Sequence, residues 1–413
     1  MDNPGGIREI VERMRHRFAW LDGLIVQGSG RPAGETGDME LPLLTSSVLE
    51  RFYYTDSNPL AMQPGIRSYR TSGTSSGRRK TIYYSEQDEA DYLRVKLDVF
   101  RDILEPYGYK TAVSDMGTGH AEATAAEVFR QLGMTVESLS FRLPIRQHIE
   151  SLERLRPEVL YTMPSILDRL LAAAGEPAAL GIRHVILVGE TASPGWRSQA
   201  AQRLGIGEDR ITDTYGSIEI GTIASYSPRC GRYLLADGII AEGVSAEELG
   251  EGLRPLSEGE QVLVLTSSIR EAFPALRYVT YDVVRDLRTI EVEGVPRQSF
   301  HSLVKRIGPD LKHGEKISIY DIEDTVCRHL GSASVRVVVE GNSLRIAVDS
   351  GQGSDAALEL IRQELENRNP DIGTMIRSGI LGGIQVVRKS LDDTGEQGSV
   401  KNKKIHYRQG EFG

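Results

Sequence analysis

Residues 157–174 read PEVLYTMPSILDRLLAAA, in which a short apolar run, Val159–Thr162, is followed by a helical pattern, Ser165–Ala174. The same order of strand-like run and amphipathic segment recurs between residues 80 and 312. The other expected strands are Lys110–Val113, Thr135–Leu139 and His184–Val188, and the expected helices include Glu86–Leu104, Ala121–Leu132, Arg146–Arg154 and Gly195–Leu204. Strands separated by helices of this length predict a doubly wound, mainly parallel sheet.

The pattern changes towards the C-terminus. It turns β-rich from Gln261 onward, and Val335–Glu340 and Leu344–Val348 flank a Gly-Asn turn that is typical of a hairpin. A chain of 413 residues also exceeds the roughly 250–300 at which one core stops growing. We therefore expect an α/β protein. Its large N-terminal domain, residues 1–306, would hold the parallel sheets and a β-rich subdomain. A small, mobile α+β domain would follow at residues 307–413.

The bulk composition excludes several function classes. The chain has a formal charge of −9 and no stripe of lysine and arginine, so no nucleic-acid partner is expected. No apolar run approaches the roughly 18 residues of a membrane helix, and Met1–Arg17 lacks the apolar segment of a signal peptide. Cys230 and Cys327 lie far apart, without metal-site spacing. We expect a cytoplasmic protein with no membrane partner and no thiolate zinc site.

The loop Thr71-Ser72-Gly73-Thr74-Ser75-Ser76-Gly77, followed by Arg78-Arg79-Lys80, is dense in hydrogen-bond donors. Glycines allow backbone N–H groups to converge, hydroxyls add rotatable donors, and the cations add charge. The loop therefore indicates a clamp for a polyphosphate, although its spacing is not that of a Walker loop. A plain solvated turn is the alternative.

Two further segments indicate a nucleotide site. In Asp213–Glu219, Tyr215 could stack on a base and Glu219 could hold Mg²⁺. Asp282 lies among β-branched residues, where an aspartate is unfavourable in a strand unless it has a role such as binding the ribose hydroxyls. A buried tyrosine, a solvated glutamate and a turn aspartate paired with Arg285 are the structural alternatives.

The segment Met116–Glu122 imitates a dinucleotide fingerprint, but Glu122 occupies the third glycine position. A glycine-rich floor for a small-molecule pocket, with His120 at its edge, is the preferred interpretation over NAD binding or a plain helix start. The basic tail, Lys401–Arg408, reads on composition alone as a solvated terminus.

Taken in order, these segments resemble the motifs of the adenylate-forming superfamily of acyl-CoA synthetases and adenylation domains. The similar segments are Thr71–Lys80, Tyr215–Glu219, Arg277–Asp282, Lys305-Arg306 with the stretch to Glu323, and Lys404-Ile405. The resemblance covers residues 40 to 410. It implies ATP-dependent activation of a carboxylic acid to an acyl-adenylate, with release of pyrophosphate.

The branch and the acceptor are less sharply indicated. Leu41–Thr45, Pro164-Ser165 and Gly189-Glu190 look most like the phenylacetate–CoA ligase branch. Thr74–Gly77 and Gly314–Ser318 are also similar to acyl-amido synthetases that conjugate plant hormones to amino acids. The resemblance thus implies an aryl or similar small acid and transfer to a thiol, of CoA or of a carrier protein's phosphopantetheine. The alternative is transfer to an amine.

Several positions depart from the superfamily pattern. Tyr281 stands in place of the glycine before the ribose aspartate, and Lys305 in place of the glycine before Arg306. Lys403 also replaces a glycine, so Lys403 and Lys404 compete for the role of the tail lysine. The zinc cysteines of some phenylacetate-branch members have no counterpart.

Roles follow from the resemblance residue by residue. The expected catalytic residues are Lys404, Thr74 and Glu219, of which Lys404 would bridge carboxylate and phosphate and Glu219 would bind Mg²⁺. The expected nucleotide-binding residues are Ser72, Gly73, Thr74, Lys80, Glu190, Tyr215, Asp282 and Arg306. The expected acyl-pocket residues are Asp115, Gly117, His120, Pro164, Gly189 and Gly216. An unrelated binding protein or NAD enzyme built on the Gly117–Gly119 loop is the remaining class, and it would show no pyrophosphate exchange.

Overall fold

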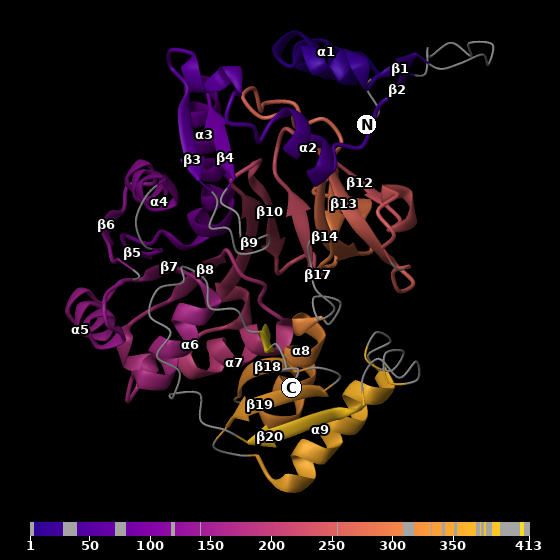
Figure 1. Ribbon diagram of the computed structural model, residues 1–413. Helices are drawn as coiled ribbons and strands as arrows, with labels where there is room; N and C mark the ends of the chain where they lie inside the picture. The colour runs from indigo at the N-terminus through magenta and orange to yellow at the C-terminus, as the bar shows by residue number, and fades with distance from the viewer. Residues whose placement is uncertain are drawn as a thin grey trace. The chain divides into compact units, whose positions relative to one another are not determined.

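The computed structural model describes most of the chain (Figure 1). The described residues are 4–27, 39–70, 80–116, 120–140, 142–253, 255–308, 318–331, 333–340, 343–350, 353–368, 372, 376, 382–388 and 405–408. The predicted site residues outside these ranges are Ser72, Gly73, Thr74, Gly117 and Lys404, and of His120 only the backbone is described. The chain forms two compact units. The first comprises residues 1–99, 215–302 and 308–310, and the second residues 100–214, 303–307 and 311–413.

The second unit contains the expected parallel sheet. Its strands run in the order β9-β8-β7-β5-β6, and every neighbouring pair is parallel. The strands are β5 (Thr111–Asp115), β6 (Thr135–Ser138), β7 (Val159–Thr162), β8 (His184–Val188) and β9 (Ile211–Ser217), the last of which leaves the second unit after Thr214. The connecting helices are α4 (His120–Gln131), α5 (Ile145–Leu155), α6 (Pro164–Ala173) and α7 (Pro194–Leu204). The α/β fold class is therefore confirmed.

Both faces of this sheet are covered, as β7 illustrates. Leu160 belongs to a buried core that also contains residues of α5, α6 and α7. The next residue, Tyr161, points to the opposite face because side chains alternate along a strand. Its ring packs against Phe129 of α4 and Phe100 of α3 (Glu86–Leu104), at centroid distances of 6.4 and 5.3 Å. Strands buried on both faces explain the continuous apolar runs in the sequence.

The first unit is built from antiparallel strands. One set pairs in the order β15-β16-β11-β10, another in the order β12-β13-β14, and β3 pairs with β4. These strands are β3 (Arg67–Arg70), β4 (Thr81–Tyr84), β10 (Gly221–Ser227), β11 (Arg232–Leu235), β12 (Ile239–Val244), β13 (Glu260–Ser267), β14 (Tyr278–Arg285), β15 (Arg288–Val292) and β16 (Val295–Phe300). The remaining α-helices and strands before the C-terminal part are α1 (Pro4–Arg17), α2 (Ser46–Phe52), β1 (Val26–Gln27), β2 (Met39–Glu40) and β17 (Ser302–Arg306).

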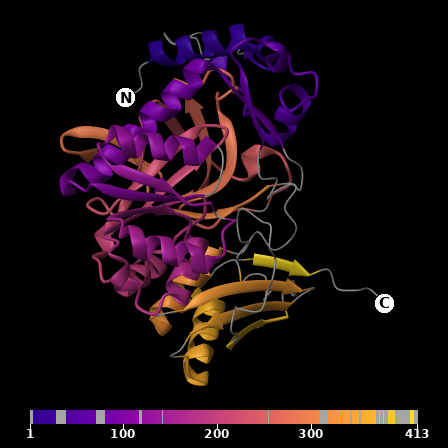
Figure 2. The ribbon, with the colours of Figure 1, turned by 90° about the vertical axis from the view of Figure 1, so that its left-hand side faces the viewer.

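Residues from 318 onward form a small sheet with its own core inside the second unit (Figure 2). The strand order is β20-β19-β18-β21, and β18 and β19 are the expected hairpin. Its elements are α8 (Ile319–Leu330), β18 (Ser334–Glu340), β19 (Ser343–Asp349), α9 (Asp355–Arg368), β20 (Ile384–Arg388) and β21 (Ile405–Arg408). Apolar side chains of α8 and α9 pack with those of the sheet. A domain boundary near residue 306 remains a prediction.

None of the helices in the described ranges has the length and apolar character needed to cross a bilayer.

Candidate functional site

Predicted site residues gather at the carboxyl edge of the parallel sheet. Asp115 pairs in register with Thr162, and Val188 pairs with Thr214 of β9, so the ends of β5, β7 and β8 lie beside one another. Two of these strand ends lead into predicted positions: Pro164 after β7, and Gly189 and Glu190 after β8. Tyr215 and Gly216 lie within β9 but belong to the first unit. Ligands of open α/β sheets bind outside such strand ends. The topology therefore places Pro164, Gly189 and Glu190 of the second unit where a substrate site is expected.

Glu190 joins two of the loops at this edge. Its carboxylate accepts hydrogen bonds from the Ser165 backbone N, at 2.8 Å, and from the Ser165 hydroxyl, at 2.9 Å. Ser165 lies in the first turn of α6, which begins at Pro164, so the carboxylate also meets the positive end of the helix dipole. Gly189 has φ +83°, a left-handed conformation that favours glycine. Glu190 thus stabilises the loop that was expected to line the adenine site.

Asp115, expected in the acyl pocket, is fully buried and faces protein atoms. The Nδ1 atom of His148 lies 3.0 Å from its carboxylate, and His148 Nε2 lies 3.2 Å from the Leu143 carbonyl oxygen. The imidazole thus links the buried carboxylate to the Leu143 carbonyl oxygen. Burial raises the pKa of Asp115, and the hydrogen bond from His148 opposes that rise. A direct contact of Asp115 with substrate remains a prediction.

In the first unit, Tyr215 and Asp282 are in direct contact. The Tyr215 hydroxyl donates to Asp282 Oδ2 at 2.6 Å, and the Tyr215 ring meets Phe300 edge-on at 6.2 Å. The Asp282 backbone N donates to Thr280 Oγ1 at 3.0 Å. Asp282 is half-buried. The structure thus brings together two of the residues predicted to bind the nucleotide.

Tyr281, which replaces the superfamily glycine, keeps a glycine-like backbone. Its φ is +63°, in the left-handed region that is unfavourable for a bulky residue. Its hydroxyl accepts from the Ser46 backbone N at 3.0 Å and donates to Glu251 Oε1 at 2.9 Å. These two bonds and the burial of the ring offset the backbone strain. The substitution therefore preserves the chain path that leads to Asp282.

Glu219, the predicted metal ligand, lies in the turn Ile218–Ile220 between β9 and β10. The Tyr84 hydroxyl donates to the Ile218 carbonyl oxygen at 2.6 Å, and Arg270 Nε donates to the Glu219 carbonyl oxygen at 2.9 Å. The Glu219 side chain is half-buried. The backbone on both sides of this carboxylate is thus fixed by buried side chains.

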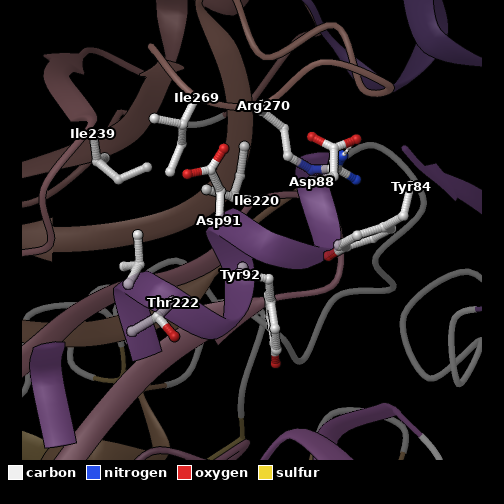
Figure 3. A pocket seen from close by; sticks show the side chains of 11 residues that line it. Tyr84, Asp88, Asp91, Tyr92, Ile220, Thr222, Ile239, Ile269 and Arg270 are labelled. Carbon is white, nitrogen blue, oxygen red and sulfur yellow. Dashed lines mark ion pairs between the residues drawn. The ribbon is translucent and has the colours of Figure 1, made fainter. Parts of the chain in front are cut away.

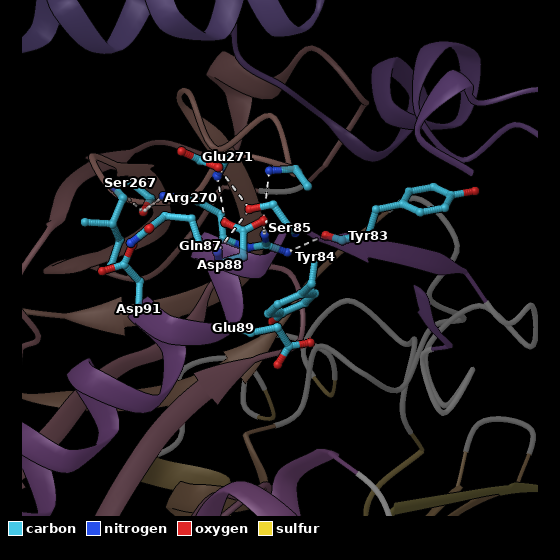
Figure 4. Close-up of polar contacts among 12 residues, drawn as sticks. Tyr83, Tyr84, Ser85, Gln87, Asp88, Glu89, Asp91, Ser267, Arg270 and Glu271 are labelled. Carbon is cyan, nitrogen blue, oxygen red and sulfur yellow. Dashed lines mark hydrogen bonds and ion pairs between the residues drawn. The ribbon is translucent and has the colours of Figure 1, made fainter. Parts of the chain in front are cut away.

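Arg270 is the centre of a buried network that the sequence did not predict (Figure 4). It forms an ion pair with Asp88, donates to the Tyr83 carbonyl oxygen at 2.9 Å, and stacks 3.8 Å from the Tyr84 ring centroid. Asp88 in turn accepts three backbone N–H groups, those of Ser85, Glu271 and Ala272. Buried charges are tolerated only when they are paired and hydrogen-bonded to this degree. The network ties the start of α3 to the Glu219 turn.

The two cations predicted to bind the nucleotide, Lys80 and Arg306, lie in different units. Lys80 is half-buried in the first unit, with its Nζ 3.5 Å from Glu50 Oε1 and 4.8 Å from the Tyr54 ring centroid. Arg306 is exposed at the end of β17, in the second unit. Their contacts with a nucleotide remain predictions.

A small pocket in the first unit lies between the face of α3 and the beginning of β10 (Figure 3). Its lining comprises Tyr84, Asp88, Asp91, Tyr92, Val95, Ile220, Gly221, Thr222, Ile239, Ile269 and Arg270. None of the residues predicted from the sequence lines it. Among the described residues, no three histidine, cysteine, aspartate or glutamate side chains form a cluster that could hold a metal ion.

Two relatives match this chain in sequence over two thirds of its length or more. It is 38% identical over 347 residues to the fumarate–(S)-2,3-diaminopropanoate ligase of Enterobacter agglomerans, covering 84% of this chain and 86% of that protein. It is 27% identical over 302 residues to the phenylacetate–coenzyme A ligase of Thermus thermophilus, covering 67% of this chain and 63% of that protein. Residues 312–392 match a family model described as the fumarate–diaminopropanoate ligase C-terminal domain.

A solved structure supports the same fold. The crystal structure of 2-hydroxyisobutyryl-CoA ligase in the postadenylation state matches this chain with a TM-score of 0.71 at 15% identity. The match covers 98% of this chain and 88% of that one. The two chains therefore share the same fold over almost the full length of this chain.

Proposed function

Because the chain belongs to the phenylacetate–CoA ligase-like branch of the adenylate-forming ligases, we propose that it activates a small dicarboxylic acid with ATP and joins the acyl group to an amine. The observation that best supports nucleotide binding is the hydrogen bond from Tyr215 to Asp282. It holds a half-buried carboxylate beside an aromatic ring, and a carboxylate can accept both hydroxyls of a ribose. The pairing joins two motifs that are distant in the sequence.

In the first half-reaction, a carboxylate oxygen of the acid bonds to the α-phosphorus of ATP, and the bond from that phosphorus to the bridging oxygen breaks. Pyrophosphate leaves and the acyl-adenylate remains. Two anions must approach each other, so charge compensation and positioning supply most of the catalysis. Lys80 and the loop before it would compensate the β- and γ-phosphates, and Lys404 would compensate the reacting carboxylate and α-phosphate.

Glu219 fits the role of a protein ligand for the magnesium ion that accompanies ATP. An ion held mainly by phosphate oxygens requires only one or two protein carboxylates. Glu219 is half-buried on a turn whose carbonyl groups are fixed by Tyr84 and Arg270. A bound magnesium ion supplies neutralisation of the charge on the departing pyrophosphate.

In the second half-reaction, the nitrogen of the amine attacks the acyl carbonyl, AMP leaves with the electron pair of the broken carbon–oxygen bond, and the amine loses a proton. The similarity to a ligase of fumarate and an amino acid favours this acceptor and an aliphatic dicarboxylic acid. The aryl acid and the thiol acceptor expected from the phenylacetate branch are the second candidate, which the lower similarity to phenylacetate–CoA ligase supports.

The proposal is tested in two steps. ATP–pyrophosphate exchange is measured over a panel of mono- and dicarboxylic acids, aliphatic and aromatic, and we expect exchange only with small dicarboxylates. The active acid is then incubated with ATP and either amino acids or CoA, and products are identified by mass spectrometry. Amide with an amino acid and no thioester is the expected result. Exchange with none of the acids, or thioester without amide, would reject it.

A further inference from the structure

Strand β14 is bulged at the aspartate that was predicted to bind the ribose. Val264 of β13 pairs with Val279 of β14, and Val262 pairs with Val283. One residue of β13 therefore lies opposite three residues of β14, residues 280–282. A β-bulge of this kind bends the strand, re-aims a side chain and is common beside active sites. The predicted ribose aspartate is the last residue of the bulge.

The Thr280 side chain bonds to both strands at this bulge. Its hydroxyl donates to the Leu263 carbonyl oxygen at 2.7 Å and accepts from the Asp282 backbone N at 3.0 Å. The middle residue, Tyr281, has φ +63°, a conformation that glycine adopts readily and that a Cβ disfavours. Beyond it, the Asp282 carboxylate accepts the Tyr215 hydroxyl at 2.6 Å. The backbone conformation at residue 281 thus lies directly before the aspartate that it orients.

The hydroxyl of Tyr281 ties this conformation to a segment that is distant in the sequence. It accepts from the Ser46 backbone N at 3.0 Å and from Ser46 Oγ at 3.3 Å, and it donates to Glu251 Oε1 at 2.9 Å. Burial raises the pKa of Tyr281 to about 12, so the hydroxyl keeps the proton that it donates. The Val279 backbone N also donates to the Leu44 carbonyl oxygen, at 3.1 Å. The start of α2 is therefore attached to the bulge through the tyrosine and through the main chain.

Resting on the proposed function, we propose that Tyr281 is a positioning residue for ATP, which acts through Asp282. The left-handed backbone at Tyr281 places the Asp282 carboxylate beside Tyr215, where it accepts the ribose hydroxyls. A glycine reaches this conformation without help. The tyrosine reaches it through its hydrogen bonds to Ser46 and Glu251. The affinity for ATP thus depends on a backbone conformation that the tyrosine hydroxyl maintains.

The test measures the binding of ATP and of 2′,3′-dideoxy-ATP, each with magnesium, by isothermal titration calorimetry. Wild type should bind ATP at least about tenfold more tightly, because only ATP offers hydroxyls to Asp282. Tyr281→Ala keeps a Cβ but loses the ring and the hydroxyl, so it should lose this preference. Tyr281→Gly loses the same groups but adopts a positive φ freely, so its preference should stay within about threefold of wild type.

This pair of variants separates positioning from folding. Both lose the buried ring, so both should have a lower melting temperature, and instability alone would affect their ATP preference alike. Tyr281→Phe keeps the ring and loses only the hydroxyl, so its preference should lie between those of wild type and Tyr281→Ala. Glu293 also has a positive φ, +52°, in the exposed turn between β15 and β16. Glu293→Ala and Glu293→Gly are the matched control pair and should both keep the wild-type preference.

Three outcomes would overturn the inference while leaving the adenylate chemistry intact. They are equal ATP preference in Tyr281→Ala and Tyr281→Gly, a full wild-type preference in Tyr281→Phe, and equal binding of the two nucleotides by wild type. The phenylalanine variant decides the question if Tyr281→Ala does not fold. Absence of ATP binding by wild type, together with absence of pyrophosphate exchange for every acid, would instead reject the proposed function itself.

Discussion

The hydroxyl of Tyr215 and the carboxylate of Asp282, 67 residues apart in sequence, form a hydrogen bond of 2.6 Å. The bond connects the end of β9 to the middle of β14 within the first unit. A hydrogen bond to a charged group contributes about 1.5–3 kcal/mol, so the bond from Tyr215 helps to hold the Asp282 carboxylate in one orientation. This geometry makes the nucleotide assignment testable.

Asp282→Asn should weaken ATP binding without changing the preference among acids. The amide offers one acceptor in place of two, so we expect the KM for ATP to rise about tenfold, equivalent to about 1.4 kcal/mol. ATP–pyrophosphate exchange at varied ATP and fixed acid measures the effect. Asp286→Asn is the matched control, because Asp286 lies just beyond β14 and pairs with Arg232. A change in acid selectivity with normal ATP dependence would mean that the nucleotide binds elsewhere.

Arg270→Lys should disturb both stability and the magnesium requirement. Lysine cannot reach the Glu219 carbonyl, the Tyr83 carbonyl and Asp88 together, so the buried pair is impaired and the Glu219 turn is released. Breaking a buried pair costs up to about 3–5 kcal/mol of unfolding free energy. We expect a lower denaturation midpoint and a higher magnesium concentration for half-maximal exchange.

The matched control for Arg270 is Arg94→Lys on the same helix as Asp88. Arg94 forms exposed pairs with Asp91 and Asp98, which are worth about 0–1 kcal/mol. Its substitution should leave both measurements unchanged. If Arg270→Lys lowered stability but left the magnesium dependence as in wild type, the network would support folding without positioning Glu219.

The parts of the structure that the sequence predicted are local. Val159–Thr162 and His184–Val188 are strands, and Glu86–Leu104 is a helix, with the bounds expected from their patterns. Their apolar runs and flanking caps are encoded by neighbouring residues. Asp88 shows the limit, since it was readable as part of a helix start but its pairing with Arg270 leaves no local signal. The burial of Lys96 in α3 could not be predicted either, because a single lysine within an amphipathic helix is normally solvated.

The glycine motif shows a second kind of limit. The sequence pattern does not show that β9 continues through Tyr215 and Gly216 to Ser217. Tyr281 stands in place of the superfamily glycine, and its φ of +63° preserves the local chain path. Backbone conformation at such positions depends on tertiary contacts, here those from Ser46 and Glu251, that a sequence does not display.

His148→Leu should make stability more sensitive to pH. Asp115 is buried, and its pKa is already raised, so the native state binds its proton more tightly than the unfolded state. Unfolding free energy attributable to such a group is greatest below the unfolded pKa of about 3.9 and falls as pH rises towards the folded pKa. Removing His148 takes away the group that opposes the rise in the pKa of Asp115. The folded pKa should then be higher, so the loss of unfolding free energy should extend to higher pH.

Urea denaturation between pH 4 and 8 measures this effect. His148→Leu should lose up to about 3–5 kcal/mol relative to wild type at pH 7, because a buried charge is left without its partner, and less at pH 4. His148→Gln keeps a hydrogen-bond donor for Asp115, so its unfolding free energy should lie between that of wild type and that of His148→Leu. A pH-independent loss in both variants would mean that His148 acts through packing alone.

The tail lysine should matter for adenylation but not for transfer. Lys404 lies outside the described residues, but the next residue, Ile405, begins β21, whose backbone pairs in parallel with β18 at Val337. A lysine that only neutralises the reacting carboxylate and α-phosphate is not needed once the adenylate carries an activated carbonyl. Lys404→Ala should therefore lose pyrophosphate exchange by orders of magnitude and still convert chemically supplied acyl-adenylate to product at a near-normal rate.

Lys403→Ala is the matched control and should retain both half-reactions. If the loss instead fell on Lys403→Ala, the tail lysine would be one position earlier, and equal loss of both half-reactions in Lys404→Ala would assign it to folding or acceptor binding.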